Sequence, residues 1–291
     1  MASLKEVKNR INSVTSTRKI TSAMKLVASS KLHRAQVAIA SMLPYDEQLN
    51  GMMARFVSEL HDVVSSPYTE QRKVEHAVII TISSNSSLCG AFNANVIKKM
   101  TKVMEELNQQ GISQIDLIPV GVKVGEKVRK LGFPFESNHS SLLDNPNYVA
   151  ASQIASNLMS RFANKEIDKV VLIYNHFKNT STQILTKEVF LPVDLNAMKK
   201  INSGSMKSLD YIIEPSQEEI VSELIPKVLH LKIYTAILDS LASEHAARVV
   251  AMQIATDNAD ELLNELNLMY NKSRQAAITS ELLDIVGASF Q

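Results

Sequence analysis

Residues 227–286 read KVLHLKIYTAILDSLASEHAARVVAMQIATDNADELLNELNLMYNKSRQAAITSELLDIV and contain neither glycine nor proline. At ~1.5 Å per residue, this stretch predicts one α-helix about 90 Å long, whereas helices of globular proteins average about 11–12 residues. A helix of that length cannot fit inside a compact domain and must project from it. The stretch therefore predicts a long helix that needs a partner along its length, and a mechanical or connective role for the chain.

Apolar residues recur along this helix at a spacing of four and three. Stepping in this way from Tyr234 to Leu283 gives fifteen positions, and eleven of them are apolar, including Leu262 and Met269. This spacing is typical of a coiled coil. Alanine and serine alternate with leucine on the stripe, which predicts that two helices pack closely here with a modest apolar area per contact.

The N-terminal segment provides a second amphipathic helix. Residues 2–60 carry apolar side chains at helical spacing, among them Val7, Ile20 and Val27, with Pro44 as the first proline. The spacing predicts a helix with a narrow apolar stripe. We expect a kink at Pro44, after which the helix resumes.

The two ends of the chain have opposite charge. Residues 1–44 carry eight basic side chains and one acidic side chain, whereas residues 227–291 carry five basic and eight acidic ones. Because a central segment connects the two helices, an intrachain pair would be antiparallel. The charges therefore predict an antiparallel two-helix coiled coil formed by both termini.

A register follows if Pro44 and Pro226 mark the points where the helices enter the central segment. It sets three charged pairs in opposition: Lys5 with Glu265, Arg10 with Asp260, and Lys31 with Asp239. The C-terminal helix would then extend beyond its partner by about 17 residues, or ~26 Å, from near Tyr270. An unpaired apolar tip of this kind must be covered by another protein.

The middle of the chain has a different pattern, in which apolar, β-rich runs alternate with helix-like stretches. This alternation indicates a mostly parallel sheet covered by helices, with a last strand that can pair antiparallel to the one before it. We expect strands at 76–83, 114–122, 169–174 and 184–193, and helices at 92–109, 122–131 and 147–164.

The predicted organisation is thus α/β plus long helices, with a central Rossmann-like α/β domain. It has three segments: a coiled-coil helix over 1–60, the α/β domain over 74–195, and a second coiled-coil helix over 215–291. A loop over 196–210 precedes the last helix. Ser216, followed by Glu219, fits a capping box that begins this helix.

The candidate reactive residues form no catalytic or metal-binding group. The turn over 83–90, SSNSSLCG, follows a strand, but it matches neither GxGxxG nor GxxxxGK[ST], so we favour a polar turn over a phosphate cradle. Cys89 is best read as a small buried residue. The seven histidines form no HxxxH or HExxH pair. We expect no catalytic residue, no metal site and no cofactor.

Composition narrows the class of protein further. A net charge of +1 and a hydrophobic content of 45% are typical of a soluble, foldable chain. The basic stripe over 5–34 lacks interleaved aromatic residues, so nucleic-acid binding is not indicated. No apolar run reaches the ~18–20 residues that span a bilayer. The single cysteine excludes an intramolecular disulfide, and the N-terminus does not resemble a secretory signal.

Several blocks of sequence resemble the F-type ATP synthase gamma subunit, in the order that family has them. The resemblance spans the full length and is highly specific. The blocks are LKEVKNRINSVTSTRKITSAMKLVASSK (4–31), SLCGAFN (87–93), SEHAARVVAM (243–252), ATDNA (255–259) and YNKSRQAAITSEL (270–282).

The resemblance implies a rotor shaft of the bacterial type. In that family, the two terminal helices form a coiled coil inside a ring of alternating alpha and beta subunits. The α/β domain lies against the epsilon subunit and the membrane c-ring, and one copy is present per complex. Such a chain has no catalytic site of its own. It would associate with the membrane only through the complex, on the cytoplasmic face of the bacterial inner membrane.

The resemblance also implies which residues contact partner subunits. The tip residues Arg274, Gln275, Thr279 and Glu281 match the family's contacts with the beta subunits, and Met24 and Arg248 match positions near the neck of the shaft. Two other readings remain open from the residues alone. One is a non-rotary coiled-coil scaffold with an α/β docking module, and the other is an α/β enzyme with helical arms for dimerisation.

Overall fold

A computed structural model describes residues 4–59, 66–112, 114–135, 137–194, 214 and 216–289. Its two longest elements are α1, Leu4–Glu59, and α7, Gln217–Ser289. The prediction that the first helix resumes after Pro44 is confirmed, since α1 continues through this proline, and α7 likewise continues through Pro226. The predicted loop over 196–210 lies outside the described residues.

The chain divides into two compact units. The helical unit comprises Met1–Ser30 and Arg248–Gln291, and the central unit comprises Lys31–Ala247. The boundary between these two units cuts across both long helices. The three segments predicted from the sequence, 1–60, 74–195 and 215–291, instead keep each long helix whole. The three-segment division stays a prediction.

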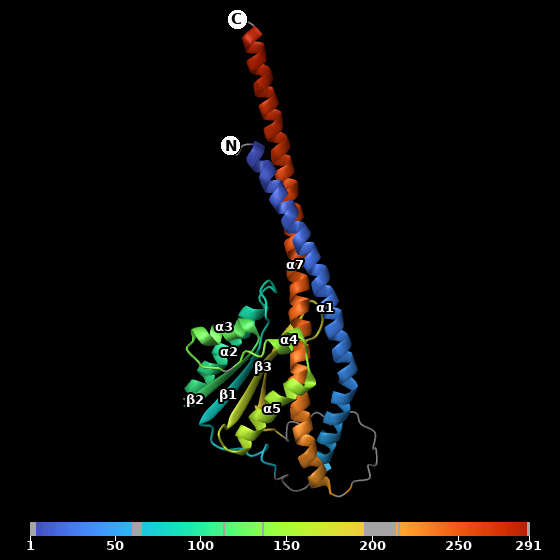
Figure 1. Ribbon diagram of the computed structural model, residues 1–291, viewed down its shortest axis with the longest axis vertical. Helices are drawn as coiled ribbons and strands as arrows, with labels where there is room; N and C mark the ends of the chain where they lie inside the picture. The colour runs from blue at the N-terminus through green and yellow to red at the C-terminus, as the bar shows by residue number, and fades with distance from the viewer. Residues whose placement is uncertain are drawn as a thin grey trace. The chain divides into compact units, whose positions relative to one another are not determined.

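The central unit contains a four-stranded sheet in the order β2-β1-β3-β4 (Figure 1). Strand β1 pairs in parallel with β2 and with β3, while β3 pairs antiparallel with β4. The strands are β1, His76–Ile82; β2, Gln114–Val120; β3, Lys169–Phe177; and β4, Gln183–Leu191. All four strands and the hairpin formed by the last two confirm the prediction from apolar runs.

Helices cover both faces of this sheet, as expected for an α/β fold. On one face, Ile79 and Ile173 pack with α2, Phe92–Gln109, and α3, Val122–Lys130. These two helices begin at the predicted residues and end within one residue of the predicted ends. Strands β1 and β3 are buried on both faces, which explains why they read as continuous apolar runs, whereas β2 and β4 at the two edges of the sheet are only partly buried.

The opposite face of the sheet packs against α5, Tyr148–Ala163, and against parts of α1 and α7 that belong to the central unit. Met53 of α1 and Ile225 of α7 are almost fully buried in this core. The helix at 148–163 was predicted, but the short α4, Ser141–Asp144, was not. The shared core holds both long helices on the α/β body.

The start of α7 is capped as the sequence predicts. The backbone amide of Glu219 donates to the Ser216 hydroxyl oxygen at 3.3 Å. This bond satisfies one of the four amides that have no partner inside the first turn of a helix.

Candidate partner-binding surface of the terminal helices

In the helical unit, α1 and α7 run antiparallel, and polar side chains join them. Arg18 Nη1 lies 2.8 Å from Asp260 Oδ1, and the hydroxyls of Thr21 and Thr256 lie 2.8 Å apart. Thr21 is only 9% exposed. The antiparallel coiled coil is therefore confirmed, with a contact surface that contains threonine and arginine as well as apolar residues.

The predicted register of this pair is wrong by about one heptad. Asp260 pairs with Arg18 instead of Arg10, which moves the partner eight positions along α1. Asp239 lies in the central unit and pairs with His176 of β3 instead of Lys31. The prediction counted charges alone, and one exposed ion pair is worth only roughly 0–1 kcal/mol, too little to set a register.

The predicted apolar stripes hold at several positions, such as Met252, Ala259 and Leu266 of α7, but each stripe also contains an exposed position. On α7, Leu263 is 9% exposed and Leu262 is 43% exposed, although the stepping pattern placed Leu262 at the contact. On α1, Ile20 is 59% exposed, while the adjacent Thr21 is buried. On α1 the apolar count fails because the residue that faces the partner helix, Thr21, is polar.

The C-terminal part of α7 extends beyond the start of α1, as Figure 1 shows. Leu266 is the last buried residue of α7, and beyond it Tyr270, Ser273 and Ala277 are half-buried. The remaining side chains described from 267 onward are exposed. The predicted overhang is confirmed, but it begins a few residues beyond the predicted Tyr270, because the contact of Thr21 with Thr256 sets Leu4 opposite Ser273.

The exposed tip combines polar and apolar side chains. Its large apolar members are each 48% exposed or more: Ile278, Leu282, Leu283, Ile285 and Val286. Contiguous exposed apolar groups of this kind mark interaction surfaces, because water-exposed leucine and isoleucine forgo burial worth roughly 1.5–3 kcal/mol each. The tip has the composition of a surface that another protein covers.

The four tip residues singled out from the sequence lie on this overhang. Arg274, Gln275, Thr279 and Glu281 are exposed, and Thr279 donates to the Gln275 backbone carbonyl at 2.9 Å. Residues four apart share a helix face, so Gln275 and Thr279 lie one turn above each other. Their contact with a partner stays a prediction.

The two neck residues have different environments. Met24 on α1 is half-buried, whereas Arg248 on α7 is only 8% exposed. Arg248 is therefore largely covered within this chain alone. Its contact with a partner also stays a prediction.

Several cations of α1 are available to a partner. Lys5, Lys8 and Arg10 are exposed, and within the described residues none of them has an ion-pair partner. The register explains this, because the acidic side chain expected opposite Arg10 is bonded to Arg18 instead. The first turns of α1 therefore present unpaired positive charge.

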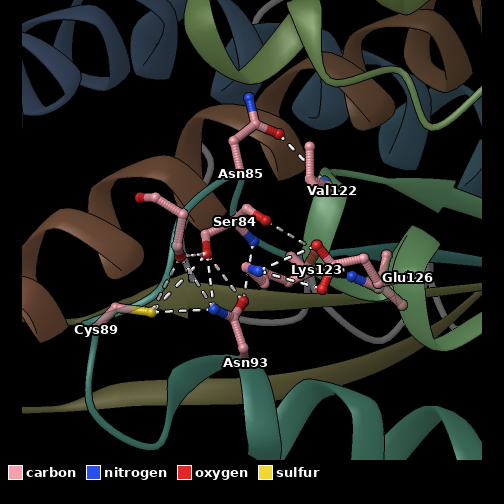
Figure 2. Close-up of polar contacts among 10 residues, drawn as sticks. Ser84, Asn85, Cys89, Asn93, Val122, Lys123 and Glu126 are labelled. Carbon is pink, nitrogen blue, oxygen red and sulfur yellow. Dashed lines mark hydrogen bonds and ion pairs between the residues drawn. The ribbon is translucent and has the colours of Figure 1, made fainter.

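The polar turn after β1 is satisfied internally (Figure 2). Asn93 Oδ1 accepts from the Ser84 backbone amide at 3.1 Å, and its amide nitrogen lies 3.2 Å from Cys89 Sγ. Asn85 donates to the Ser140 carbonyl and accepts from the Val122 amide. With these groups bonded to each other, the turn fits the polar-turn reading made from the sequence.

Cys89 is 1% exposed, in agreement with its reading as a small buried residue. Among the described residues, no three His, Cys, Asp or Glu side chains gather as metal ligands do. No helix in the described part of the chain is long and apolar enough to cross a membrane.

Comparison with known proteins decides the family. A family model described as ATP synthase matches residues 3–289, and the ATP synthase gamma chain of Phocaeicola vulgatus is 54% identical over 99% of both chains. The chain belongs to the ATP synthase gamma chain family. Another family member, the gamma chain of Bacteroides thetaiotaomicron, is 53% identical over the full length of both chains.

Solved structures share the family fold. A chain of the Euglena gracilis mitochondrial ATP synthase rotor aligns with a TM-score of 0.62 at 18% identity, covering 94% of this chain and 98% of that one. A chain from the central stalk and c-ring of the Tetrahymena thermophila mitochondrial enzyme aligns with a TM-score of 0.57 at 24% identity, covering 81% and 99%. These likenesses confirm the predicted combination of long terminal helices with a central α/β domain.

Proposed function

We propose that this chain is the central rotor shaft of an F-type ATP synthase. It couples ion-driven rotation of the membrane c-ring to ATP synthesis or hydrolysis at the alpha/beta ring. The observation that carries the proposal is the exposed, partly apolar overhang of α7, in a chain 54% identical to an ATP synthase gamma chain.

The mechanism requires that the shaft contact each beta subunit differently. A ligand or partner shifts an equilibrium between conformations only by its difference in affinity for them. One asymmetric helix pair inside a ring presents different side chains to each neighbour at any moment. Rotation then moves each beta subunit through its nucleotide affinities in turn, and the coupling is reciprocal between shaft and nucleotide.

The partners in this proposal are the alpha, beta and epsilon subunits and the c-ring, with one copy of the chain per complex. The tip residues Arg274, Gln275, Thr279 and Glu281 contact the beta subunits. Met24 and Arg248 contact partner subunits near the neck of the shaft. The unpaired cations of α1 face acidic loops of the ring. The α/β domain rests against epsilon and the c-ring.

The chain performs no bond chemistry in this proposal. The complex as a whole is an ion-transporting ATP synthase, and this subunit biases the conformations of its partners. Its relatives named above are bacterial, which supports a place on the cytoplasmic face of the cell membrane, where the chain is held peripherally by the complex.

A triple variant of the tip tests this assignment against a static scaffold. Arg274→Ala/Gln275→Ala/Thr279→Ala should leave the complex assembled but reduce ATP-driven ion pumping per ATP hydrolysed, because contacts specific to the rotor are lost. The matched control is Lys98→Ala/Gln109→Ala, two exposed residues of α2. Equal pumping per ATP in the triple variant, the control and the unmodified complex would favour the scaffold.

A further inference from the structure

Two polar side chains are buried without a protein partner near the carboxyl ends of β1 and β3. Among the described residues, no group is hydrogen-bonded to Thr81 Oγ1 on β1 or to Asn175 Nδ2 on β3. Thr81 is 1% exposed and Asn175 is 5% exposed, so neither atom is in contact with bulk solvent. Folded proteins rarely bury such groups unpaired, because the hydrogen bonds that they make to water in the unfolded chain are then not replaced.

The two side chains lie on the same face of the sheet. Thr81 follows Ile79 by two residues on β1, and Asn175 follows Ile173 by two residues on β3. Ile79 and Ile173 belong to the core that packs against α2 and α3. Because side chains alternate between the two faces along a strand, Thr81 and Asn175 are directed to the same side of the sheet as these isoleucines.

The strand register sets the distance between the two residues. Thr81 pairs with Ile173 in the parallel register of β1 and β3, so Asn175 lies two residues further along the neighbouring strand. With a rise of ~3.3 Å per residue and a strand spacing of ~4.8 Å, the two Cα atoms lie about 8 Å apart. At that separation, a threonine hydroxyl and an asparagine amide can both reach one water molecule between them.

The neighbouring protein groups are engaged elsewhere or lack a donor. On the other side of Thr81, the register partner on β2 is Pro119, which has no backbone N–H. The hydroxyl of Ser83, two residues beyond Thr81, accepts from the Val124 backbone amide at 3.0 Å. The Asn175 backbone carbonyl accepts from the Ser243 hydroxyl at 3.1 Å.

The chemistry of the site favours a small neutral ligand. Asn175 Nδ2 requires an acceptor, whereas Thr81 Oγ1 can both donate and accept. The turn that follows β1, SSNSSLCG over 83–90, has no charged side chain, so a buried anion would have no opposite charge from this turn. A nucleotide is also excluded by size, because both side chains are almost completely covered. Water has the required size, neutrality and hydrogen-bonding capacity.

We propose that one ordered water molecule is bound between Thr81 and Asn175. It accepts a hydrogen bond from Asn175 Nδ2 and is hydrogen-bonded to Thr81 Oγ1. Ligands of open α/β sheets bind outside the carboxyl ends of the strands, and here that end of the sheet holds a structural water. The water joins the end of β1 to β3 directly before the polar turn. This inference is independent of the proposed rotor function.

Thr81→Val tests the occupant through its effect on stability, because valine has nearly the shape of threonine but cannot hydrogen-bond. If the water is bound, the variant loses a satisfied hydroxyl, and the thermal midpoint of the full-length chain should fall by about 3 °C. If the site is dry, the variant removes an unsatisfied buried hydroxyl, and the midpoint should rise or stay the same. Either of these last two results would overturn the proposal.

The matched control makes the same substitution on β4. The Thr186 hydroxyl donates to the Ile184 backbone carbonyl at 3.1 Å in an exposed setting. Water can therefore replace that bond, and Thr186→Val should shift the midpoint by less than about 1 °C. A fall in the control as large as that in Thr81→Val would attribute the effect to the change of side chain and would overturn the proposal.

A crystal structure of the full-length chain, at a resolution that shows ordered water, locates the occupant directly. We expect density for one water within ~3.2 Å of both Thr81 Oγ1 and Asn175 Nδ2, and no density at that position in Thr81→Val. A dry site, or a direct bond between the two side chains, would overturn the proposal whichever way the midpoint moves. Density larger than a water molecule would also overturn it and would indicate a different ligand.

Discussion

Asp168 connects the base of the sheet to the segment that enters it. Its Oδ1 accepts from Arg72 Nε at 2.6 Å, and its Oδ2 accepts from the backbone amides of Glu75 and His76, both at 2.9 Å. Arg72 also donates to the carbonyls of Phe162 and Ile167 and lies over the Phe162 ring, 4.4 Å from its centroid. One charged pair thus ties three separate stretches of the central unit together.

These bonds lower the pKa of the Asp168 carboxyl. Burial raises it, but the backbone amides of His76 and Glu75 and the Arg72 guanidinium outweigh burial, so the pKa is held below its ordinary value of 3.8. A carboxyl with a depressed pKa in the folded state contributes stability above its unfolded pKa. That contribution is lost as the pH falls through the folded value.

Asp168→Asn should therefore lower the free energy of unfolding at pH 7 by about 2 kcal/mol, because charge-assisted bonds are lost. The difference from the unmodified chain should narrow as the pH falls below 3.8, because the stability contributed by the depressed pKa is lost between the ordinary value and the lower folded value. Urea unfolding at pH 7 and pH 3 measures both. Glu75→Gln, in the exposed pair with Lys73, is the control and should change stability little at either pH.

Elements built from apolar runs were predictable, whereas the coiled-coil contact was not. Strand β1 reads HAVIITI and is buried on both faces, so its sequence alone distinguishes it from a surface strand. On α1, by contrast, Thr21 faces α7 although Ile20 beside it is the more apolar residue. The hydrogen bond between the hydroxyls of Thr21 and Thr256 depends on the partner helix, and no periodicity in one helix reveals it.

The same limit applies to the contacts between elements. Asp239 was paired with Lys31 on charge alone, but His176 of β3 lies 2.7 Å from it. Only the packing of the sheet on α7 brings these residues together. The tip of α7 was predictable because it depends on the lengths of two helices, and helix length can be read from the absence of breakers.

The corrected contact surface of α7 predicts unequal effects at two adjacent leucines. Leu263→Ala removes a side chain that is 9% exposed and should lower the free energy of unfolding by roughly 2–3 kcal/mol. Leu262→Ala removes one that is 43% exposed and should cost less than about 1 kcal/mol. Chemical denaturation of the two variants measures the difference. A larger loss of unfolding free energy in Leu262→Ala than in Leu263→Ala would support the apolar stripe predicted from the sequence.

The register predicts which engineered cysteines can meet. In a Cys89→Ser background, Val14→Cys with Leu263→Cys should form a disulfide, because the contact of Thr21 with Thr256 sets these positions opposite each other. Val7→Cys with Leu263→Cys should not, since it is displaced by one heptad. Oxidation followed by electrophoresis without reductant distinguishes the pairs. A reversed yield would support the register predicted from charge.

In the proposed function, separate regions of the molecule have separate tasks. The exposed tip of α7 is the proposed surface for the ring, and the central unit is the proposed surface for the base of the rotor. The helical unit has few buried residues, among them Val7, Ala28 and Leu266. A coiled coil with so little buried area gains stability when partner subunits enclose it, and a shaft inside a ring is enclosed in this way.

The central claim is that this chain turns relative to an alpha/beta ring. In the most direct measurement, the ring of the assembled complex is fixed to a surface and a visible probe is attached to an exposed position of the central unit, such as Lys98. ATP is then added. The account predicts sustained rotation of the probe in one direction, at a rate that follows ATP hydrolysis. A probe that stays fixed while the same complexes hydrolyse ATP would contradict it.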